Sequence, residues 1–162
     1  MEALDAIDRL ILAELQRDGR LTNQDLSDRV GLSPSPCLRR VRRLEDAGVI
    51  SGYRAVVSPK AVDLEITAFV RLRLASHEGA TVDAVEQRLR AIPSIVEAHL
   101  LAGDWDYLVR IVTPTFEAYE RLLREHLRAI PSLSSIDTTF AFGVTKPLSP
   151  LPVDGASAPR GS

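Results

Sequence analysis

Four arginines lie within one short stretch of the 162-residue chain and are its clearest candidates for ligand chemistry: Arg39, Arg40, Arg42 and Arg43. A guanidinium group can bind two phosphate oxygens at once or the acceptor edge of guanine, so such a cluster is typical of a nucleic-acid-binding surface. No acidic residue lies between Arg29 and Leu44 to neutralise it. The alternative is a solvated helix whose arginines only keep it soluble. The cluster predicts DNA contact if the residues around it form a helix of the right kind.

A second stretch with possible binding chemistry is Gly103, Asp104, Trp105 and Asp106. Gly and Asp are the residues that a turn between two strands requires, which is a purely structural interpretation. Two carboxylates beside exposed backbone N–H groups also suit a free amino acid, whose ammonium needs an acceptor and whose carboxylate needs donors. The residues alone leave both interpretations open. Trp105 is either an exposed turn aromatic or a residue that shapes ligand specificity.

Catalytic and metal-binding constellations are not expected anywhere in the sequence. His77, His99 and His126 stand at spacings unlike those of metal ligands, and no glycine-rich loop for phosphate is present. The only cysteine, Cys37, falls on the apolar side of its helix, where free cysteine acts as a small hydrophobe. We therefore expect no enzyme activity, no metal and no cofactor. A cofactor-free enzyme with a pocket on a sheet stays a lesser alternative.

The arginines belong to a segment, residues 21–48, that reads as two helices joined by a tight turn. Thr22 is a good N-cap for the first helix, and Gly31 is a typical residue just past its end. Ser33 with Pro34, or Ser35 with Pro36, then supplies a cap followed by proline in the first turn of the second helix. At 100° per residue, Arg39 and Arg43 lie in the middle of the helix face that is opposite an apolar row. The apolar row comprises Cys37, Val41 and Leu44. This arrangement matches a helix-turn-helix whose second helix enters the DNA major groove.

An earlier helix is expected from Asp5 to near Gly19, because Leu4, Ile7, Leu10, Ile11 and Leu15 recur at helical spacing. Residues 49–57 read as one or two short strands, either a wing or a connector. A change of composition near Lys60 marks a domain boundary.

The second part of the chain contains an internal repeat, since residues 89–94 and 127–132 both read Leu-Arg-Ala-Ile-Pro-Ser. In each copy an amphipathic helix ends before the proline and a strand follows, and a further strand precedes each helix. The order predicts a ferredoxin-like βαββαβ domain. The expected last strand alternates Ile136, Thr138, Phe140, Phe142 and Val144 with smaller residues, which favours self-association through the sheet.

Composition limits the remaining possibilities. Hydrophobic residues make up 45% of the chain, as in an ordinary folded protein, and the net charge of −2 arises from acidic residues after residue 60. The positive charge of the first part is concentrated on one helix, which is what DNA contact depends on. No apolar run approaches the ~20 residues that span a bilayer, and the first residues are acidic where a signal peptide is basic, so we expect a cytoplasmic protein without membrane contact.

The motif Ser33, Pro34, Ser35, Pro36, Cys37, Leu38, the arginine run after it and the Gly-Asp-Trp-Asp-Tyr turn at residues 103–107 resemble the Lrp/AsnC family, the feast/famine transcription regulators. The resemblance covers residues 4 to about 146. It implies an N-terminal DNA-binding domain, a C-terminal domain that senses amino acids, and dimers built by strand pairing and sheet packing, often assembled into octamers. The tail after Lys146 is not part of the family pattern.

Taken together, these expectations define an α+β protein with four parts. Residues 1–50 form a helix-turn-helix (winged-helix-like) domain, residues 51–64 short strands and a linker, residues 65–146 a ferredoxin-like sensing and oligomerisation domain, and residues 147–162 a disordered Pro/Ser-rich tail. The expected partners are double-stranded DNA, an amino-acid effector and further copies of the chain, as a homodimer or an octamer. An effector-independent architectural DNA-binding protein is the alternative. The residues expected to contact DNA are Thr22, Asn23, Ser33, Pro34, Ser35, Pro36, Arg39, Arg40, Arg42 and Arg43. The resemblance places the effector, by position, at Gly103, Asp104, Asp106, Phe116, Thr139 and Ala141.

Overall fold

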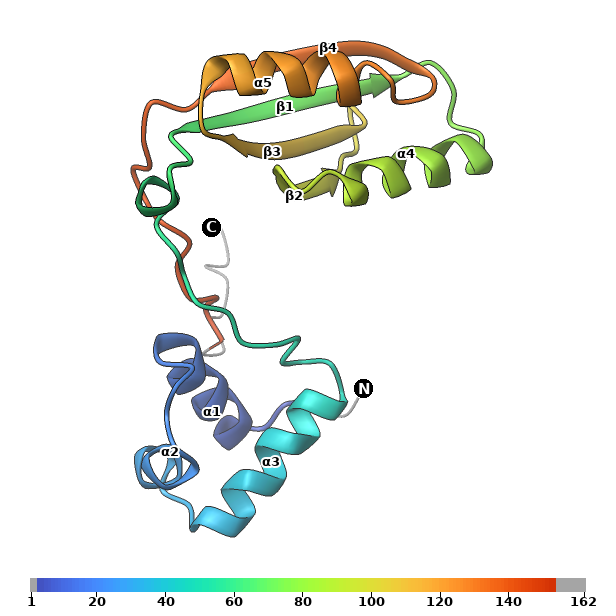
Figure 1. The fold of residues 1–162 in the computed structure, drawn as a ribbon. Helices are drawn as coiled ribbons and strands as arrows, with labels where there is room; N and C mark the ends of the chain where they lie inside the picture. Colours follow the sequence, from blue (N-terminus) through green and yellow to red (C-terminus); the bar gives the residue numbers. More distant parts are fainter. Residues whose placement is uncertain (1–2, 154–162) are drawn as a thin grey trace, which may run out of the picture. The chain divides into compact units, whose positions relative to one another are not determined.

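A computed structural model of the chain describes residues 3–153. The chain forms two compact units, which we describe separately (Figure 1). A helical unit contains the residues up to Val56 together with the chain from Lys146 onward, and a sheet unit spans Val57–Thr145. The chain therefore passes from one unit to the other twice.

The helical unit consists of α1 (Ala6–Arg17), α2 (Asn23–Val30) and α3 (Pro34–Asp46). Asp5 caps α1 in a capping box with Asp8, and Thr22 caps α2 by accepting a hydrogen bond from the backbone N–H of Asp25. Gly31 ends α2 with a φ of 70°, a left-handed conformation that glycine adopts without strain. These boundaries confirm the helices expected from the sequence. The apolar sides of the three helices form one small core: Ile11, Leu12, Leu26, Val30, Cys37 and Leu44.

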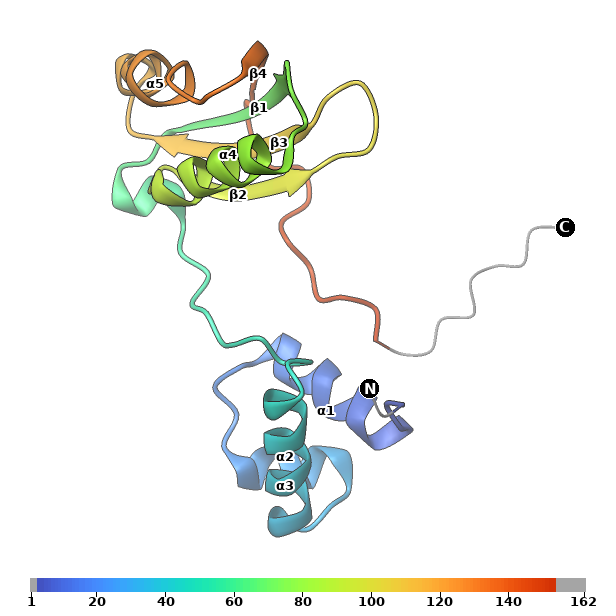
Figure 2. The same cartoon turned by 90° about the vertical axis from the view of Figure 1, so that its right-hand side faces the viewer.

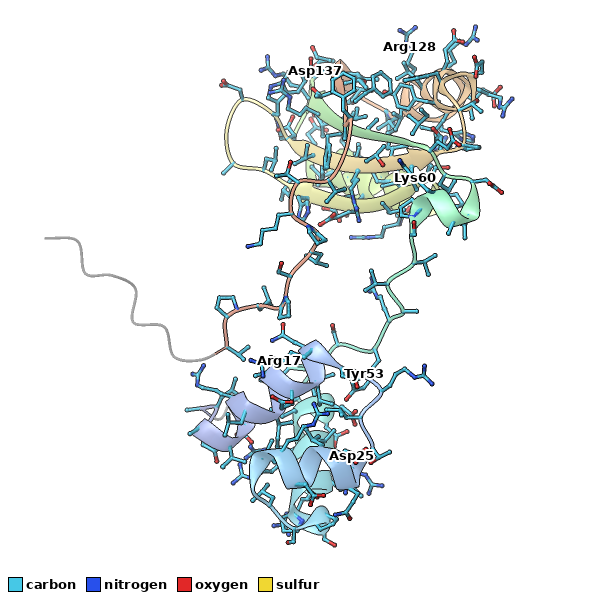
Figure 3. All side chains as sticks on the ribbon, turned by 90° about the vertical axis from the view of Figure 1, so that its left-hand side faces the viewer. Arg17, Asp25, Tyr53, Lys60, Arg128 and Asp137 are labelled. Atoms are coloured by element: carbon cyan, nitrogen blue, oxygen red, sulfur yellow. The ribbon has the colours of Figure 1, made fainter. Side chains whose placement is uncertain are left out.

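The strands expected over residues 49–57 are wrong, because the structure has no regular hydrogen-bonding pattern there. Val56 and Val57 are exposed, so the β-branched residues that favoured a strand have no sheet to join. Tyr53 instead lies against the helical unit (Figure 3), where its hydroxyl donates a 3.0 Å hydrogen bond to the Glu45 carboxylate.

The disordered tail expected over residues 147–162 is wrong at its beginning. The backbone of Leu151 exchanges two hydrogen bonds with the side-chain amide of Gln16, at 2.7 and 3.1 Å. The Val153 carbonyl accepts a 2.9 Å hydrogen bond from the Arg9 side chain, and the Val153 side chain packs against the core of the helical unit. The Pro-rich composition argued for disorder, yet an extended segment needs only a few apolar and backbone contacts to dock on a helix. Residues 154–162 lie outside the described part.

The sheet unit has the element order β1 (Ile66–Leu74), α4 (Gly79–Ala91), β2 (Ile95–Leu100), β3 (Tyr107–Thr113), α5 (Phe116–Leu122) and β4 (Leu133–Phe140). A short helical turn, Pro59–Val62, precedes it, and a π-helical turn, Leu123–Leu127, continues α5. The antiparallel strands lie in the order β2-β3-β1-β4, and both helices cover one face of the sheet (Figures 1 and 2). This confirms the ferredoxin-like prediction.

Alternation along β1 separates the two faces of the sheet. Ala68, Val70, Leu72 and Leu74 are buried under the helices, whereas Phe69, Arg71 and Arg73 are exposed on the face without helices. The two copies of the repeat have matching roles, since Leu89 and Leu127, and likewise Ile92 and Ile130, are buried in the same core. Phe116, at the beginning of α5, is 56% exposed.

The last strand is shorter than expected. Its pairing with β1 reaches Phe140, and Ala141 adds one hydrogen bond to Thr67. Phe142 and Val144 continue the alternating pattern but are exposed, and the pairing with β1 ends before them although β1 extends to Ile66.

Candidate functional site

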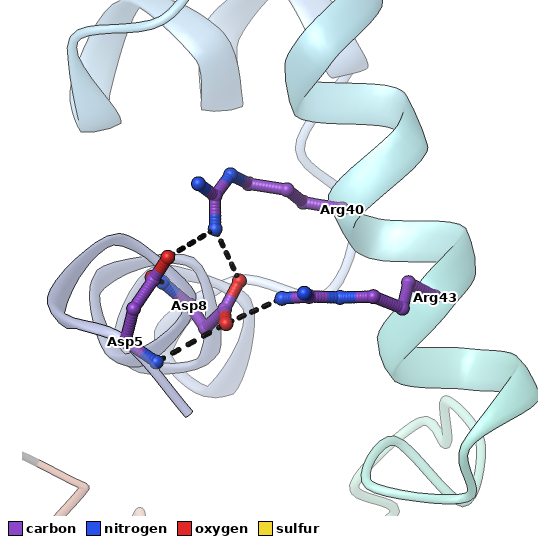
Figure 4. A network of polar contacts seen from close by, with 4 residues as sticks. All are labelled: Asp5, Asp8, Arg40 and Arg43. Carbon is purple, nitrogen blue, oxygen red and sulfur yellow. Dashed lines mark hydrogen bonds and ion pairs between the residues drawn. The ribbon is translucent and has the colours of Figure 1, made fainter. Parts of the chain in front are cut away.

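The arginines of α3 divide into two groups with different surroundings. Arg40 donates hydrogen bonds to Asp5 and Asp8 at 2.6 and 2.8 Å, and Arg43 donates one to Asp8 at 2.5 Å (Figure 4). Arg39 and Arg42 make no hydrogen bond or ion pair with any described residue and are exposed. Arg43 is exposed on the same surface as Arg39, as expected, but it is also bound to Asp8, which the sequence did not indicate.

Asp8 is the centre of the first group. Its side chain is 1% exposed, and its carboxylate accepts both arginines as well as the backbone N–H of Asp5. A buried carboxylate is stable only when its oxygens are satisfied in this way. The hydrogen bond from the Asp8 backbone N–H to the Asp5 carboxylate, followed by the bond from Arg40, lowers the pKa of Asp5. The two carboxylates thus hold α3 against the beginning of α1.

A continuous stripe of α3 stays available to a ligand. Ser35, Leu38, Arg39, Arg42 and Asp46 recur at spacings of three and four residues and, with Arg43 and Ala47, line one shallow concave surface. Leu38 is 38% exposed on this stripe. Such a surface suits DNA, because guanidinium groups can bind phosphates or base edges, and an apolar side chain and a hydroxyl can contact base edges.

The other residues expected at DNA surround the beginning of α3. Asn23 donates a 2.9 Å hydrogen bond from its side-chain amide to the carbonyl of Pro34, which ties α2 to α3. Thr22 is engaged as the cap of α2, so its hydroxyl has a structural role. Ser33 precedes the helix without a side-chain capping bond, and Ser33, Pro34 and Ser35 are exposed. Pro36 is partly buried.

The turn at residues 103–106 is bound tightly to the end of β1. The carboxylate of Asp106 accepts 2.7 Å bonds from the Leu74 backbone N–H and from His77, and its own N–H donates to the Leu72 carbonyl. The bond from Leu74 is the main reason why the pKa of Asp106 lies below its ordinary value, and His77 adds to the shift. Gly103 has a φ of 147°, which side-chain-bearing residues rarely adopt. Asp106 therefore has a clear structural role.

Trp105 contacts two arginines that are exposed on the face of the sheet without helices. The guanidinium carbons of Arg71 and Arg73 are 5.0 and 4.9 Å from its ring centroid, within cation–π range. Arg73 also donates to the Asp104 carbonyl at 2.6 Å. The indole is thus held in place next to Asp104.

The six residues expected at the effector do not meet within one chain. Gly103, Asp104 and Asp106 lie beside Leu72 and Leu74, whereas Thr139 pairs with Phe69 and Ala141 bonds to Thr67, near the opposite end of β1. At a rise of about 3.3 Å per residue, Thr67 and Leu74 are about 23 Å apart. Phe116 belongs to the Ala141 end, where its ring stacks edge-to-face on Phe140 at 5.0 Å. A single chain therefore does not bring these six residues together.

Two groups of site residues were not identified from the sequence. Asp5 was interpreted only as the start of the first helix, and Asp8 was not considered. An acidic pair at the start of one helix and a run of arginines on another were nevertheless a signal for pairing. His77, which contacts Asp106, was set aside as isolated, because 29 residues separate the two. Among residues 3–153, no group of His, Cys, Asp and Glu could hold a metal ion. Along the same residues, none of the helices has both the length and the apolarity to cross a bilayer.

Comparison with known proteins matches both units. The family model of a winged helix-turn-helix DNA-binding domain covers residues 4–51, and that of the Lrp/AsnC ligand-binding domain covers residues 67–151. The leucine-responsive regulatory proteins of Escherichia coli K12 and Klebsiella pneumoniae are each 44% identical over 135 residues, 83% of this chain and 82% of theirs.

Solved structures agree over almost the whole length. A transcriptional regulator of Neisseria meningitidis in complex with L-Met has a TM-score of 0.87 and 34% identity, covering 94% of this chain and 98% of that one. An AsnC-family regulator of Agrobacterium tumefaciens has a TM-score of 0.86 and 35% identity, covering 93% and 98%. These relatives are regulators of transcription rather than enzymes. The chain belongs to the Lrp/AsnC family of DNA-binding transcription regulators.

Proposed function

We propose that this protein is a sequence-specific transcription regulator whose affinity for DNA changes when an amino acid binds its C-terminal domain. The observation that carries the DNA-binding part is the exposed stripe of α3, where Arg39 and Arg42 have no partner among the described residues. Arg40 and Arg43 fix the orientation of the helix through Asp8. The exposed side chains at the beginning of α3, Ser33, Pro34 and Ser35, are placed to meet base edges. Binding to DNA would place the protein in the cytoplasm.

We propose further that the effector lies between two subunits. The turn of one subunit, with Gly103, Asp104 and Asp106, supplies one wall, and Phe116, Thr139 and Ala141 of another supply the second. The separation of these groups along β1 supports this arrangement, because neither half alone surrounds a ligand. The assembly is accordingly a homodimer or an octamer. The complex of the Neisseria relative with L-Met and the leucine-responsive relatives favour an apolar amino acid.

The effector can be identified by screening. Each of the twenty amino acids is added to the protein, starting with Leu and Met, and the thermal midpoint is recorded. A ligand at 100 times its dissociation constant should add ~2.7 kcal/mol to the free energy of unfolding. We expect one or a few apolar amino acids to stabilise the protein.

The functional test then uses a duplex that the protein itself selects from a random pool. Fluorescence anisotropy with this duplex and a scrambled one, with and without the stabilising amino acid, separates the outcomes. Preference for the selected duplex and a change in affinity with the amino acid are expected. Equal binding to both duplexes that no amino acid alters would instead indicate an architectural DNA-binding protein.

A further inference from the structure

An apolar side chain is exposed on the DNA-binding stripe of α3. Leu38 is 38% exposed, whereas Cys37 and Leu44 of the same helix are 0% and 2% exposed. It lines the same concave surface as Arg39 and Arg42. Because removing apolar surface from water is favourable, Leu38 gains stability from any apolar group that a ligand places against it.

Leu38 lies in the part of α3 that is suited to reading bases. It belongs to the second turn of the helix, one turn after Ser35 and one turn before Arg42. In a helix-turn-helix, residues near the N-terminus of the second helix contact base edges. Asp46 lies at the other end of the stripe, where its carboxylate repels phosphate groups. The beginning of the stripe, with Leu38, therefore approaches the bases most closely.

Among the four bases, thymine is the one with an apolar group for Leu38 in the major groove. Guanine presents two acceptors there, cytosine a donor and adenine one acceptor and one donor, whereas thymine presents an acceptor and its C5-methyl group. The guanidinium groups of Arg39 and Arg42 suit phosphates and the acceptors of guanine. A leucine can form no hydrogen bond, so the methyl group of thymine is its complementary partner.

The position of Leu38 is fixed by contacts within the helical unit. The side-chain amide of Asn23 donates a 2.9 Å hydrogen bond to the carbonyl of Pro34 at the beginning of α3. Further along the helix, Arg40 donates a 2.8 Å hydrogen bond to the buried carboxylate of Asp8. Attraction between apolar groups is effective only near contact, at about 3.5–4.0 Å between carbon atoms. A helix held in this way can therefore distinguish the presence of a single methyl group.

We infer that Leu38 determines sequence specificity by contacting the C5-methyl group of a thymine in the major groove. The inference rests on the DNA-binding part of the proposed function and assigns one base of the recognised site. Duplexes that the protein selects from a random pool should accordingly have thymine at one fixed position of every half-site. Selected duplexes without such a position would overturn the inference.

Replacement of thymine by uracil tests the contact directly, because uracil lacks only the methyl group. Each thymine of one half-site in the selected duplex is replaced in turn, and the affinity of the unaltered protein is measured by fluorescence anisotropy. Uracil at one position should weaken binding about fourfold, which corresponds to ~0.8 kcal/mol for one apolar carbon removed from water. The other positions should change the affinity much less. This scan uses the unaltered protein and does not depend on the folding of any variant.

Variants then assign the uracil effect to Leu38. Leu38→Ala should bind the thymine and uracil duplexes with equal affinity, because the side chain that contacts the methyl group is missing. Leu38→Met keeps an apolar side chain of similar volume and should retain most of the fourfold difference. Leu10→Ala is the matched control, since Leu10 is a 44% exposed leucine on α1, and it should retain the whole difference.

The outcomes separate this inference from the proposed function. If uracil weakens binding at no position, or weakens the binding of Leu38→Ala as much as that of the unaltered protein, the inference is overturned. Sequence-specific binding to the selected duplex would still stand in both cases. If the unaltered protein binds the selected and scrambled duplexes equally, the proposed sequence-specific function fails and the inference fails with it.

Discussion

At the residue scale, the two pairs of arginines on α3 should differ in function. Arg39→Ala and Arg42→Ala should each weaken DNA binding, because both side chains are exposed and unpartnered in the described structure. A contact to phosphate should lower the slope of log affinity against log salt by about one, whereas a contact to a base should cost ~1–3 kcal/mol at particular sequences. Anisotropy titrations at several salt concentrations distinguish these roles.

Arg88→Ala provides the matched control, since Arg88 is an exposed arginine on α4 in the sheet unit. It should leave both affinity and salt slope unchanged. If the double variant Arg39→Ala/Arg42→Ala binds as tightly as the unaltered protein, the assignment of the α3 stripe to DNA is wrong.

Asp106 should make the turn at residues 103–106 sensitive to acid. Its pKa is lowered from the ordinary value of 3.8, so its stabilising effect is complete above about pH 4 and is lost as the pH falls through the lower folded value. Thermal unfolding between pH 7 and about pH 2 should show this loss, and Asp106→Asn should remove the part of the pH dependence that Asp106 causes. A variant with the same pH dependence as the unaltered protein would show that the turn does not need the charge.

At the element scale, local signals predicted the helices well. Caps and glycine stops are short-range, so Asp5, Thr22 and Gly31 mark the helix limits in the sequence itself. The contacts of a long arginine side chain, in contrast, cannot be predicted from local signals. A helical wheel gives the direction of Cβ, but the long side chain of Arg43 reaches across to Asp8 on α1.

Features that depend on a distant partner could not be predicted. The alternating pattern continues past Phe140, but the pairing with β1 ends there, and Ala141 adds only one further hydrogen bond. The turn of the candidate effector site was recognised by its own residues, whereas its separation from Thr139 and Ala141 follows from strand register. The residues 49–57 were misassigned because β-branched side chains favour a strand only when a neighbouring strand is available.

The contact between α1 and α3 should depend on Asp8. Asp8→Ala removes hydrogen bonds from two arginines, and because Arg40 and Arg43 keep 29% and 44% side-chain exposure, water can replace part of the loss. We expect the helical unit to lose about 2 kcal/mol of unfolding free energy. DNA affinity should fall as well, since the orientation of α3 loosens.

Denaturant unfolding checks this prediction, with Asp28→Ala as the control because Asp28 is an exposed acidic residue of α2 that forms no ion pair in the described structure. Asp28→Ala should stay within about 0.5 kcal/mol of the unaltered protein. Equal stability of the Asp8 and Asp28 variants would contradict the role given to Asp8.

At the scale of the whole molecule, the segment that follows the sheet unit should stabilise the helical unit. Deleting residues 147–162 removes the contacts of Leu151 with Gln16 and of Val153 with Arg9 and the core. The thermal midpoint of the helical unit should fall by a few degrees, as expected for a loss of about 1 kcal/mol in a small domain. Deleting only residues 154–162 keeps every one of these contacts and should not change the midpoint. Identical midpoints for the two deletions would show that the docked segment contributes nothing.

This second connection gives the sheet unit two covalent routes to the DNA-binding helices. One route is the chain before β1, and the other is the chain after β4, which docks on α1. Because α1 also holds α3 through Asp8, the segment after β4 is linked to the DNA-binding stripe by contacts within the helical unit.

The central claim is that amino-acid binding and DNA binding are coupled, and calorimetry of the stabilising amino acid with and without the selected duplex tests it most directly. Thermodynamic linkage requires DNA to change the affinity for the amino acid by the same factor by which the amino acid changes the affinity for DNA. We predict equal factors, corresponding to a coupling free energy of ~1–3 kcal/mol. An amino acid that binds with the same affinity in the presence and absence of saturating DNA would contradict the account.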